Sequence, residues 1–110
     1  MLARENRLNK KDFENVFRKS RTLKEDFLIL KVAKNNLNQT RFGFVVSQKI
    51  SKKANVRNKV KRRLRELVGL KIEKIKKGID IVLISLPGIE KKDFPTINEN
   101  LDKLLKKTGI

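Results

Sequence analysis

The residues best suited to chemistry are the cations of residues 49–65, where nine side chains are Lys or Arg and none is acidic. Phosphate contacts dominate the affinity of proteins for nucleic acids, and each contact needs a cation near the backbone. On a helix, five polar residues of this segment fall within an arc of about 140°: Arg57, Asn58, Lys61, Arg62 and Arg65. The spacing predicts a ridge that contacts RNA, with Asn58 able to read a base edge or a 2′-hydroxyl group.

The other cations of the segment lie around this ridge. Lys49, Lys52 and Lys53 precede the expected helix, while Lys59 and Arg63 lie on its far flank. A solvated helix face is the alternative interpretation, but such a face usually alternates acidic with basic side chains. Here only one acid follows the ridge. Like charges on one helix repel, so an anionic partner explains them better.

Two aromatic rings form a second candidate site. Phe13 and Phe17 are four residues apart and share one face of an expected helix. Most aromatic pairs at this spacing belong to a hydrophobic core. Exposed rings could instead stack on unpaired bases, each stack contributing about 1–3 kcal/mol. The sequence alone leaves both interpretations open, and one ring could serve each purpose.

The acidic residues give little support for catalysis by the chain itself. Glu25, Asp26 and Asp80 could in principle hold Mg²⁺ for a two-metal nuclease, but no spacing motif joins them. Asp80 lies in an apolar segment and fits a local hydrogen-bonding role equally well. The sequence has no His and no Cys, which excludes Ser–His and Cys–His nucleophiles and the usual zinc ligands.

Composition favours one domain, 1–110, that binds a polyanion. The 110 residues include 29 Lys or Arg and 12 Asp or Glu, and this net charge of +17 repels itself unless a partner neutralises it. The apolar runs at residues 27–30 and 79–84 have strand length, whereas a membrane-spanning helix needs about 20 residues. The charged start lacks the apolar core of a signal peptide, so we expect a cytoplasmic protein.

The elements that position these groups follow from periodicity. Residues 10–19 are expected to form a helix, with Asn9 and Asp12 as its capping box. Residues 27–33 and 41–47 have the pattern of strands, and the polar turn between them predicts an antiparallel hairpin. A further short strand has room near residues 49–51.

The basic segment itself is predicted to form a helix over residues 54–68 that ends at Gly69. Its core stripe spans an arc of about 80° and comprises Val56, Val60, Leu64 and Leu67. This stripe fixes the direction in which the cations point.

The end of the chain completes an α+β domain with a small mixed sheet. The β-branched run at residues 79–84 should be a buried strand, so the preceding helix forms a crossover within the sheet. A closing helix should begin near Thr96, with Glu99 in a capping box, and end at Gly109. The expected order is α-β-β-(β)-α-β-α.

Four parts of the sequence resemble the protein subunit of bacterial ribonuclease P. The most specific is residues 57–66, Arg-Asn-Lys-Val-Lys-Arg-Arg-Leu-Arg-Glu, which is similar to the signature helix of that family. The others are residues 41–49, residues 78–82, and the opening pairs Arg7-Leu8, Asp12-Phe13 and Val16-Phe17. The resemblance covers nearly the whole chain.

The resemblance implies both a fold and a function. The fold would have a left-handed β-α-β crossover, although the general rule favours right-handed ones. The protein would assist a catalytic RNA that removes 5′ leaders from precursor tRNA by metal-dependent phosphodiester hydrolysis, with Mg²⁺ bound mainly by RNA. The implied partners are the catalytic RNA and precursor tRNA, with no membrane and no DNA, and the chain would supply no catalytic residue.

The resemblance also implies two contact regions. The RNA subunit would lie against the ridge, together with Lys49, Lys52 and Lys53, and the leader would enter a cleft at Phe13 and Phe17. The chain departs from the family at two positions, with Lys59 where Arg is frequent and Leu30 where an aromatic residue is frequent. Lysine keeps the charge but loses the bidentate geometry of arginine.

Two rival functions belong to other classes. A structural rRNA-binding protein would share the small, basic, cysteine-free composition, and the signature helix together with Phe13 and Phe17 distinguishes the two. A self-sufficient metal nuclease would need clustered carboxylates that the sequence lacks.

Overall fold

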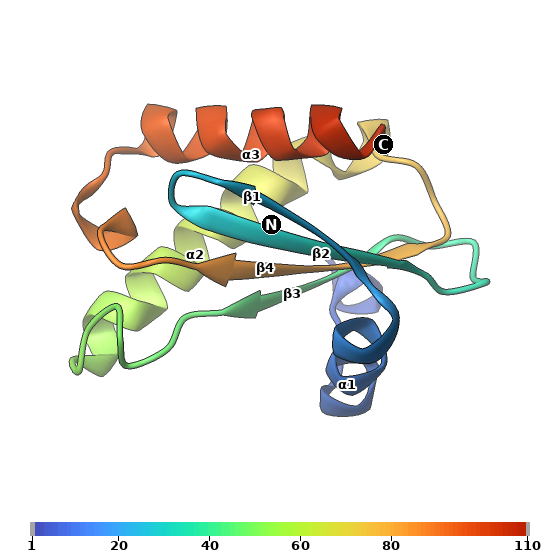
Figure 1. Ribbon diagram of the computed structural model, residues 1–110, viewed down its shortest axis with the longest axis horizontal. Coiled ribbons are helices and arrows are strands. Elements are labelled where there is room, and N and C mark those ends of the chain that lie inside the picture. Colours follow the sequence, from blue (N-terminus) through green and yellow to red (C-terminus); the bar gives the residue numbers. More distant parts are fainter. Residues whose placement is uncertain (1, 110) are drawn as a thin grey trace.

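The most apolar segment of the chain, β4 (Ile79–Ser85), lies inside a four-stranded sheet in the computed structural model, which describes residues 2–109. Its first five residues are all buried, as expected of a strand covered on both faces. On either side of it lie β2 (Leu28–Lys34), antiparallel, and β3 (Arg41–Val45), parallel. The edge strand β1 (Arg21–Glu25) pairs with β2, so the strand order is β1-β2-β4-β3 (Figure 1).

Helices complete the predicted α+β fold. α1 (Lys10–Lys19) precedes β1, α2 (Ala54–Lys71) joins β3 to β4, and α3 (Phe94–Thr108) follows β4. Short 3₁₀ turns occur at η1 (Arg4–Asn6), η2 (Ile72–Lys74) and η3 (Ile89–Lys91). The order α-β-β-β-α-β-α and the small mixed sheet confirm the expected fold class.

The hairpin predicted between residues 27–33 and 41–47 is wrong. β4 lies between β2 and β3 instead, and the polar connection of residues 35–39 runs past the start of β4. There Asn35 N donates to Gly78 O at 3.0 Å, and Gly78 N donates to the carbonyl of Gln39 at 3.1 Å. Burial explains this pairing, because β4 is the strand apolar enough to be covered on both faces.

The hairpin of the sheet is formed by β1 and β2. β1 has one apolar residue, Leu23, among charged and polar neighbours, and charged side chains are typical of edge strands. The sequence pattern therefore did not predict a strand at β1. The short strand expected near residues 49–51 is also wrong, since residues 48–50 form a turn.

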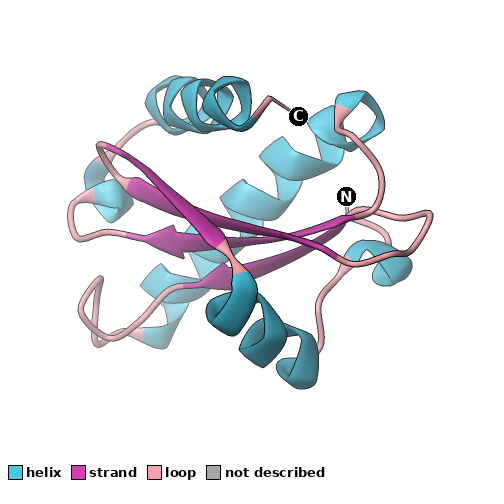
Figure 2. Cartoon of the chain, turned by 45° about the vertical axis from the view of Figure 1, so that its right-hand side comes forward, coloured by secondary structure: helices cyan, strands magenta, loops and turns pink. Residues whose placement is uncertain are grey.

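The connection from β3 through α2 to β4 is a left-handed crossover. In Figure 1 the arrows of β3 and β4 point the same way, and α2 passes behind the sheet on its way from the lower strand to the upper one. Figure 2 shows the same arrangement from a second side. The handedness implied by the family resemblance is confirmed, against the usual right-handed rule.

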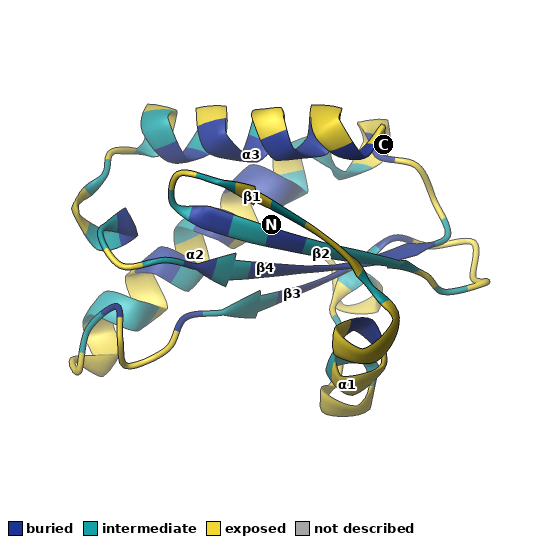
Figure 3. Ribbon diagram, in the orientation of Figure 1, coloured by how far each residue is buried: buried dark blue, intermediate teal, exposed yellow. Residues whose placement is uncertain are grey.

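The two faces of the sheet are covered unequally. α2 and α3 cover one face and enclose the main core with side chains such as Phe42, Ile81 and Leu83. α1 lies against the other face, where Val16 and Val82 are buried outside that core (Figures 1 and 2). Most of α1 faces solvent (Figure 3). This face of the sheet is therefore covered by one helix, and the opposite face by two.

α1 and α2 differ in how well local signals define their ends. Asn9 and Asp12 form the predicted capping box of α1. α2 continues through Gly69 to Lys71, because the buried residues before Gly69 offset the roughly 1 kcal/mol that glycine costs inside a helix. Within residues 2–109, no helix combines the length and apolarity needed to cross a membrane.

α3 begins at Phe94, two residues before the predicted start. The Asp93 carboxylate caps it by accepting from Thr96 N at 3.0 Å, and hydrogen bonds from Thr96 lower the pKa of Asp93. Glu99, expected in a capping box, forms an ion pair with Lys103 instead. Gly109 ends the helix in the left-handed conformation, as predicted.

Gly43 allows α1 to approach β3, because a Cβ atom at this position would overlap the ring of Phe13. We expect Gly43→Ala to lower the free energy of unfolding by about 1–3 kcal/mol, the usual cost of overpacking, measured by urea denaturation. In a Phe13→Leu background the same substitution should cost less, because the opposing side chain is smaller. An equal cost in both backgrounds would contradict the steric explanation.

Candidate nucleic-acid interface

The predicted core stripe of α2 is confirmed with one adjustment. Val60, Leu64 and Leu67 are buried, as is Val68, whereas Val56 in the first turn is only half-buried. The four buried residues attach the helix to the main core. The opposite side of α2 is therefore held at a fixed position relative to the sheet.

The polar ridge lies on that opposite side. Asn58, Arg62 and Arg65 are exposed, while Arg57 and Lys61 are half-buried at the edge of the stripe. The ridge therefore offers three exposed polar side chains and two half-buried cations, of which Arg57 is held by a hydrogen bond. An immobilised cation loses less conformational entropy when it binds a phosphate.

The loop before α2 is tied to the helix. Arg57 Nη1 donates to the carbonyl of Ser51 at 2.9 Å, and the side chain of Ile50 is buried. The three lysines of the loop are all exposed: Lys49, Lys52 and Lys53. Loop and helix together present one continuous basic surface.

The charge of this surface is not neutralised within the chain. Among residues 2–109, the ion pairs involve Arg41, Lys71, Lys103 and Lys107, and no cation of residues 49–65 takes part in one. The acids in these ion pairs, Asp12, Asp80, Asp102, Glu99 and Glu25, all pair with cations outside the basic segment. Its field is therefore available to a polyanion.

Arg63 and Lys59 lie on the far flank, as predicted. Arg63 is half-buried, and its Nη1 donates to the carbonyl of Lys92 at 3.3 Å, next to η3. Lys59 is exposed. Arg63 is thus directed toward the η3 side of the fold.

A hollow of about 150 Å³ brings the basic helix together with α1 and β3. Its lining residues are Arg7, Leu8, Phe13, Phe42, Gly43, Phe44, Lys61 and Arg65. Phe13 packs against Gly43, and α2 contributes Lys61 and Arg65. A ring beside two cations suits a nucleotide, with the base on the ring and the phosphate near the cations.

Sequence patterns identified only part of this lining. Phe13, Lys61 and Arg65 were expected to contact RNA, but in two separate regions. Arg7 reaches the hollow because it forms a parallel bridge with Phe42 of β3. Such a contact joins residues far apart in the chain and leaves no local sequence signal.

Phe17 lies outside this hollow. Its side chain is 47% exposed beside Glu14 and Arg18, and Lys31 Nζ of β2 lies 5.7 Å from the ring centroid. Leu30, the position where the family resemblance suggested an aromatic residue, is fully buried in the main core. Leu30 therefore faces away from α1, and Lys31 is the residue that faces Phe17.

The hydrogen-bonding role considered for Asp80 is confirmed. Its two carboxylate oxygens accept from Arg41 Nε at 2.9 Å and Nη2 at 2.7 Å, and one also accepts from Asn35 Nδ2 at 2.7 Å. Arg41 Nη1 donates to Asp12 at 3.0 Å. The hydrogen bonds to Asp80 raise the pKa of the Arg41 guanidinium above its ordinary value. A buried Asp in an apolar strand predicts a hydrogen-bonding partner, but the sequence does not identify which residue that partner is.

The carboxylates do not assemble a metal site. In the described part of the chain, residues 2–109, no three His, Cys, Asp or Glu side chains cluster. Asp80 is occupied by Arg41, and a hydrogen bond from Lys107 lowers the pKa of Glu25. Asp26 is exposed. The donor set therefore does not fit a Mg²⁺ ion held by this chain alone.

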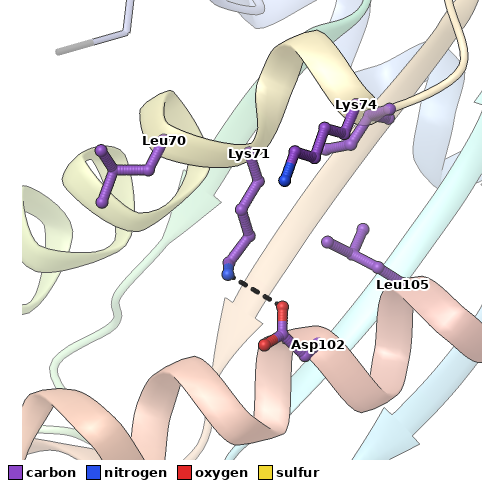
Figure 4. A pocket seen from close by; sticks show the side chains of 6 residues that line it. Leu70, Lys71, Lys74, Asp102 and Leu105 are labelled. Carbon is purple, nitrogen blue, oxygen red and sulfur yellow. Dashed lines mark ion pairs between the residues drawn. The ribbon is translucent and has the colours of Figure 1, made fainter.

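A separate hollow of about 370 Å³ lies between the end of α2 and α3 (Figure 4). Lys71 and Asp102 form an ion pair there, with Nζ 2.8 Å from Oδ1. Lys74, Ile75 and the side chains of Leu70 and Leu105 complete the lining. It contains none of the predicted site residues, so it is distinct from the basic surface.

Known proteins share both the sequence and this architecture. The model of the family described as Ribonuclease P matches residues 2–109. The chain belongs to the ribonuclease P protein family. One relative, the ribonuclease P protein component of Clostridium botulinum (strain 657 / Type Ba4), is 40% identical over 109 residues, which cover 97% of each chain.

Solved structures of ribonuclease P proteins have the same fold. The protein from Thermotoga maritima matches with a TM-score of 0.83 at 35% identity, covering 92% of this chain and 96% of that one. The Staphylococcus aureus protein matches with a TM-score of 0.85 at 25% identity, covering 94% of each chain. The family likeness therefore includes the helices that form the basic surface and the hollow.

Arg62→Ala removes an exposed cation from the ridge. We expect it to weaken RNA binding by about 1–3 kcal/mol and to reduce the slope of log Kd against log salt by about one charge. Fluorescence titrations over a series of salt concentrations would measure both quantities. Lys106→Ala, an exposed cation on α3, is the matched control and should change neither. Equal losses would mean that total charge, rather than the ridge, determines binding.

Proposed function

We propose that this chain is the protein subunit of ribonuclease P and assists a catalytic RNA in removing the 5′ leader of precursor tRNA. The RNA subunit binds the basic surface formed by Lys49, Lys52, Lys53, Arg57, Asn58, Lys61, Arg62 and Arg65. The leader lies along α1, where Phe13 and Phe17 contact its bases. The protein acts in the cytoplasm with its RNA partners and contributes no catalytic group.

The hollow between α1, β3 and α2 carries this proposal. It places the Phe13 ring and the cations of Lys61 and Arg65 around one space. Single-stranded nucleic acid is bound by this combination of stacking surface and positive charge. A purely structural binder of folded rRNA would need the charge but not the ring, so the hollow favours a partner with unpaired bases.

The chain contributes electrostatics rather than a metal site. Precursor and catalytic RNA repel each other, and the unpaired cations of α2 would reduce that repulsion where the two RNAs meet. In this proposal Mg²⁺ is bound mainly by RNA, because the carboxylates of residues 2–109 form no suitable cluster. The protein should therefore increase the rate of leader removal most at low concentrations of free Mg²⁺.

Reconstitution with a ribonuclease P RNA tests the function directly. At low Mg²⁺ concentration, the protein should increase the rate of 5′-leader removal, because its cations replace part of the screening that Mg²⁺ would provide. Gel-based cleavage assays with and without protein measure this rate. An unchanged rate would refute the proposal, and cleavage by the protein without RNA would support the nuclease alternative.

Phe17→Ala should selectively weaken the binding of substrates that carry a leader. We expect a loss of about 1–3 kcal/mol for the holoenzyme with precursor tRNA, the size of one base stack, and no loss with mature tRNA. Leu37→Ala is a matched control, because Leu37 is 46% exposed against 47% for Phe17. Equal losses on precursor and mature tRNA would show that the ring does not contact the leader.

A further inference from the structure

Arg41 joins three elements of the fold through one guanidinium group. Nε and Nη2 donate to both carboxylate oxygens of Asp80, and Nη1 donates to Asp12 Oδ2 at 3.0 Å. Asn35 also donates to Asp80. The guanidinium therefore links α1, β3 and β4, and Asn35 attaches the connection that follows β2 to the same Asp80 carboxylate. The side chains of Arg41, Asp12 and Asp80 are only 19%, 16% and 7% exposed.

α1 has few other attachments to the sheet. Val16 is its only residue that is fully buried, and Phe13 is half-buried against Gly43. The outer face of the helix is exposed (Figure 3). Asp12 Oδ2 also accepts from Asn9 N at 3.3 Å. One carboxylate thus fixes the first turn of α1 and holds that turn to the guanidinium.

The geometry of the guanidinium makes this attachment directional. Asp80 binds one edge of Arg41 with two parallel hydrogen bonds, so the remaining nitrogen, Nη1, points in a set direction. A lysine could pair with one carboxylate but could not form both contacts in a fixed fork. Because the group is largely buried, solvent and salt screen it less than a surface ion pair.

We propose that Arg41 is a positioning residue for the 5′ leader, a role that rests on the proposed function above. Asp80 orients the guanidinium, the guanidinium holds Asp12, and Asp12 fixes the place of the adjacent Phe13. That ring forms one wall of the hollow that α2 supplies with cations. Arg41 acts through α1. It fixes the place of the ring that contacts unpaired nucleotides and does not contact them itself.

Two variants separate positioning from stability. Arg41→Lys retains a cation beside Asp80 but loses the fork, and Asp12→Asn retains a capping oxygen but loses the ion pair. Each should lower the preference of the holoenzyme for precursor over mature tRNA by about tenfold, the order of one lost base stack. The affinity for the RNA subunit should stay unchanged. Amide hydrogen exchange should become faster in α1 but not in α3.

Lys71→Ala provides the matched control. It breaks the ion pair with Asp102 (Figure 4) at a side chain that is 21% exposed, close to the 19% of Arg41. This pair joins α2 to α3, which cover the face of the sheet opposite to α1 (Figure 1). The holoenzyme that contains Lys71→Ala should prefer precursor over mature tRNA as strongly as the holoenzyme with the unaltered protein. If Arg41→Lys fails to fold, Asp12→Asn still decides the question, because it leaves the Arg41–Asp80 pair intact.

The outcomes distinguish this inference from the proposed function. If the unaltered holoenzyme prefers precursor tRNA and both variants keep that preference while α1 exchanges faster, Arg41 is only structural and the inference is overturned. If the unaltered holoenzyme shows no preference for a leader, the proposed leader contact fails first. A reduced preference in both variants, with the control unchanged, supports the positioning role.

Discussion

Repulsion among the cations of α2 is outweighed by burial on the other side of the helix, and the rest of the structure depends on this balance. A pair of like charges at (i, i+4) costs about 0.2–0.5 kcal/mol, whereas burying a Val or Leu side chain contributes about 1.5–3 kcal/mol. Val60, Leu64, Leu67 and Val68 are all buried. Packing therefore exceeds repulsion, and the helix holds unneutralised charge in fixed positions for a polyanion.

The same packing makes the two faces of the sheet different. α2 and α3 form the main core with one face, while the other face receives α1, with Val16 and Val82 buried beneath it. Thin coverage leaves Phe17 exposed and Phe13 half-buried. A second helix on this face would have buried both rings. Stability is thus concentrated on one side of the sheet, and the aromatic surface is available on the other.

How much could be predicted from the sequence depended on how local the determining interactions are. The capping box of α1 and the stripe of α2 involve residues within a few positions of each other, and both were predicted. Strand pairing is not local: β4 lies between β2 and β3, and β1 has too few apolar residues to be recognised. The candidate site divides in the same way. The cations and rings were found, but the hollow that joins them depends on tertiary packing, as does the partnership of Arg41 with Asp80.

The distribution of the acidic residues connects the basic surface with the placement of α1. Asp12 and Asp80 pair with Arg41, Asp102 with Lys71, and Glu25 with Lys107, all outside residues 49–65. These paired acids thus stabilise the scaffold, and they leave the cations of residues 49–65 without an ion pair. Salt acts differently on these two sets, because at physiological ionic strength it screens exposed charges beyond about 8 Å but reaches largely buried pairs much less. Increasing salt therefore weakens the attraction of RNA to the ridge before it loosens the Arg41 contacts that hold α1, so the aromatic surface keeps its shape while the affinity of the basic surface falls.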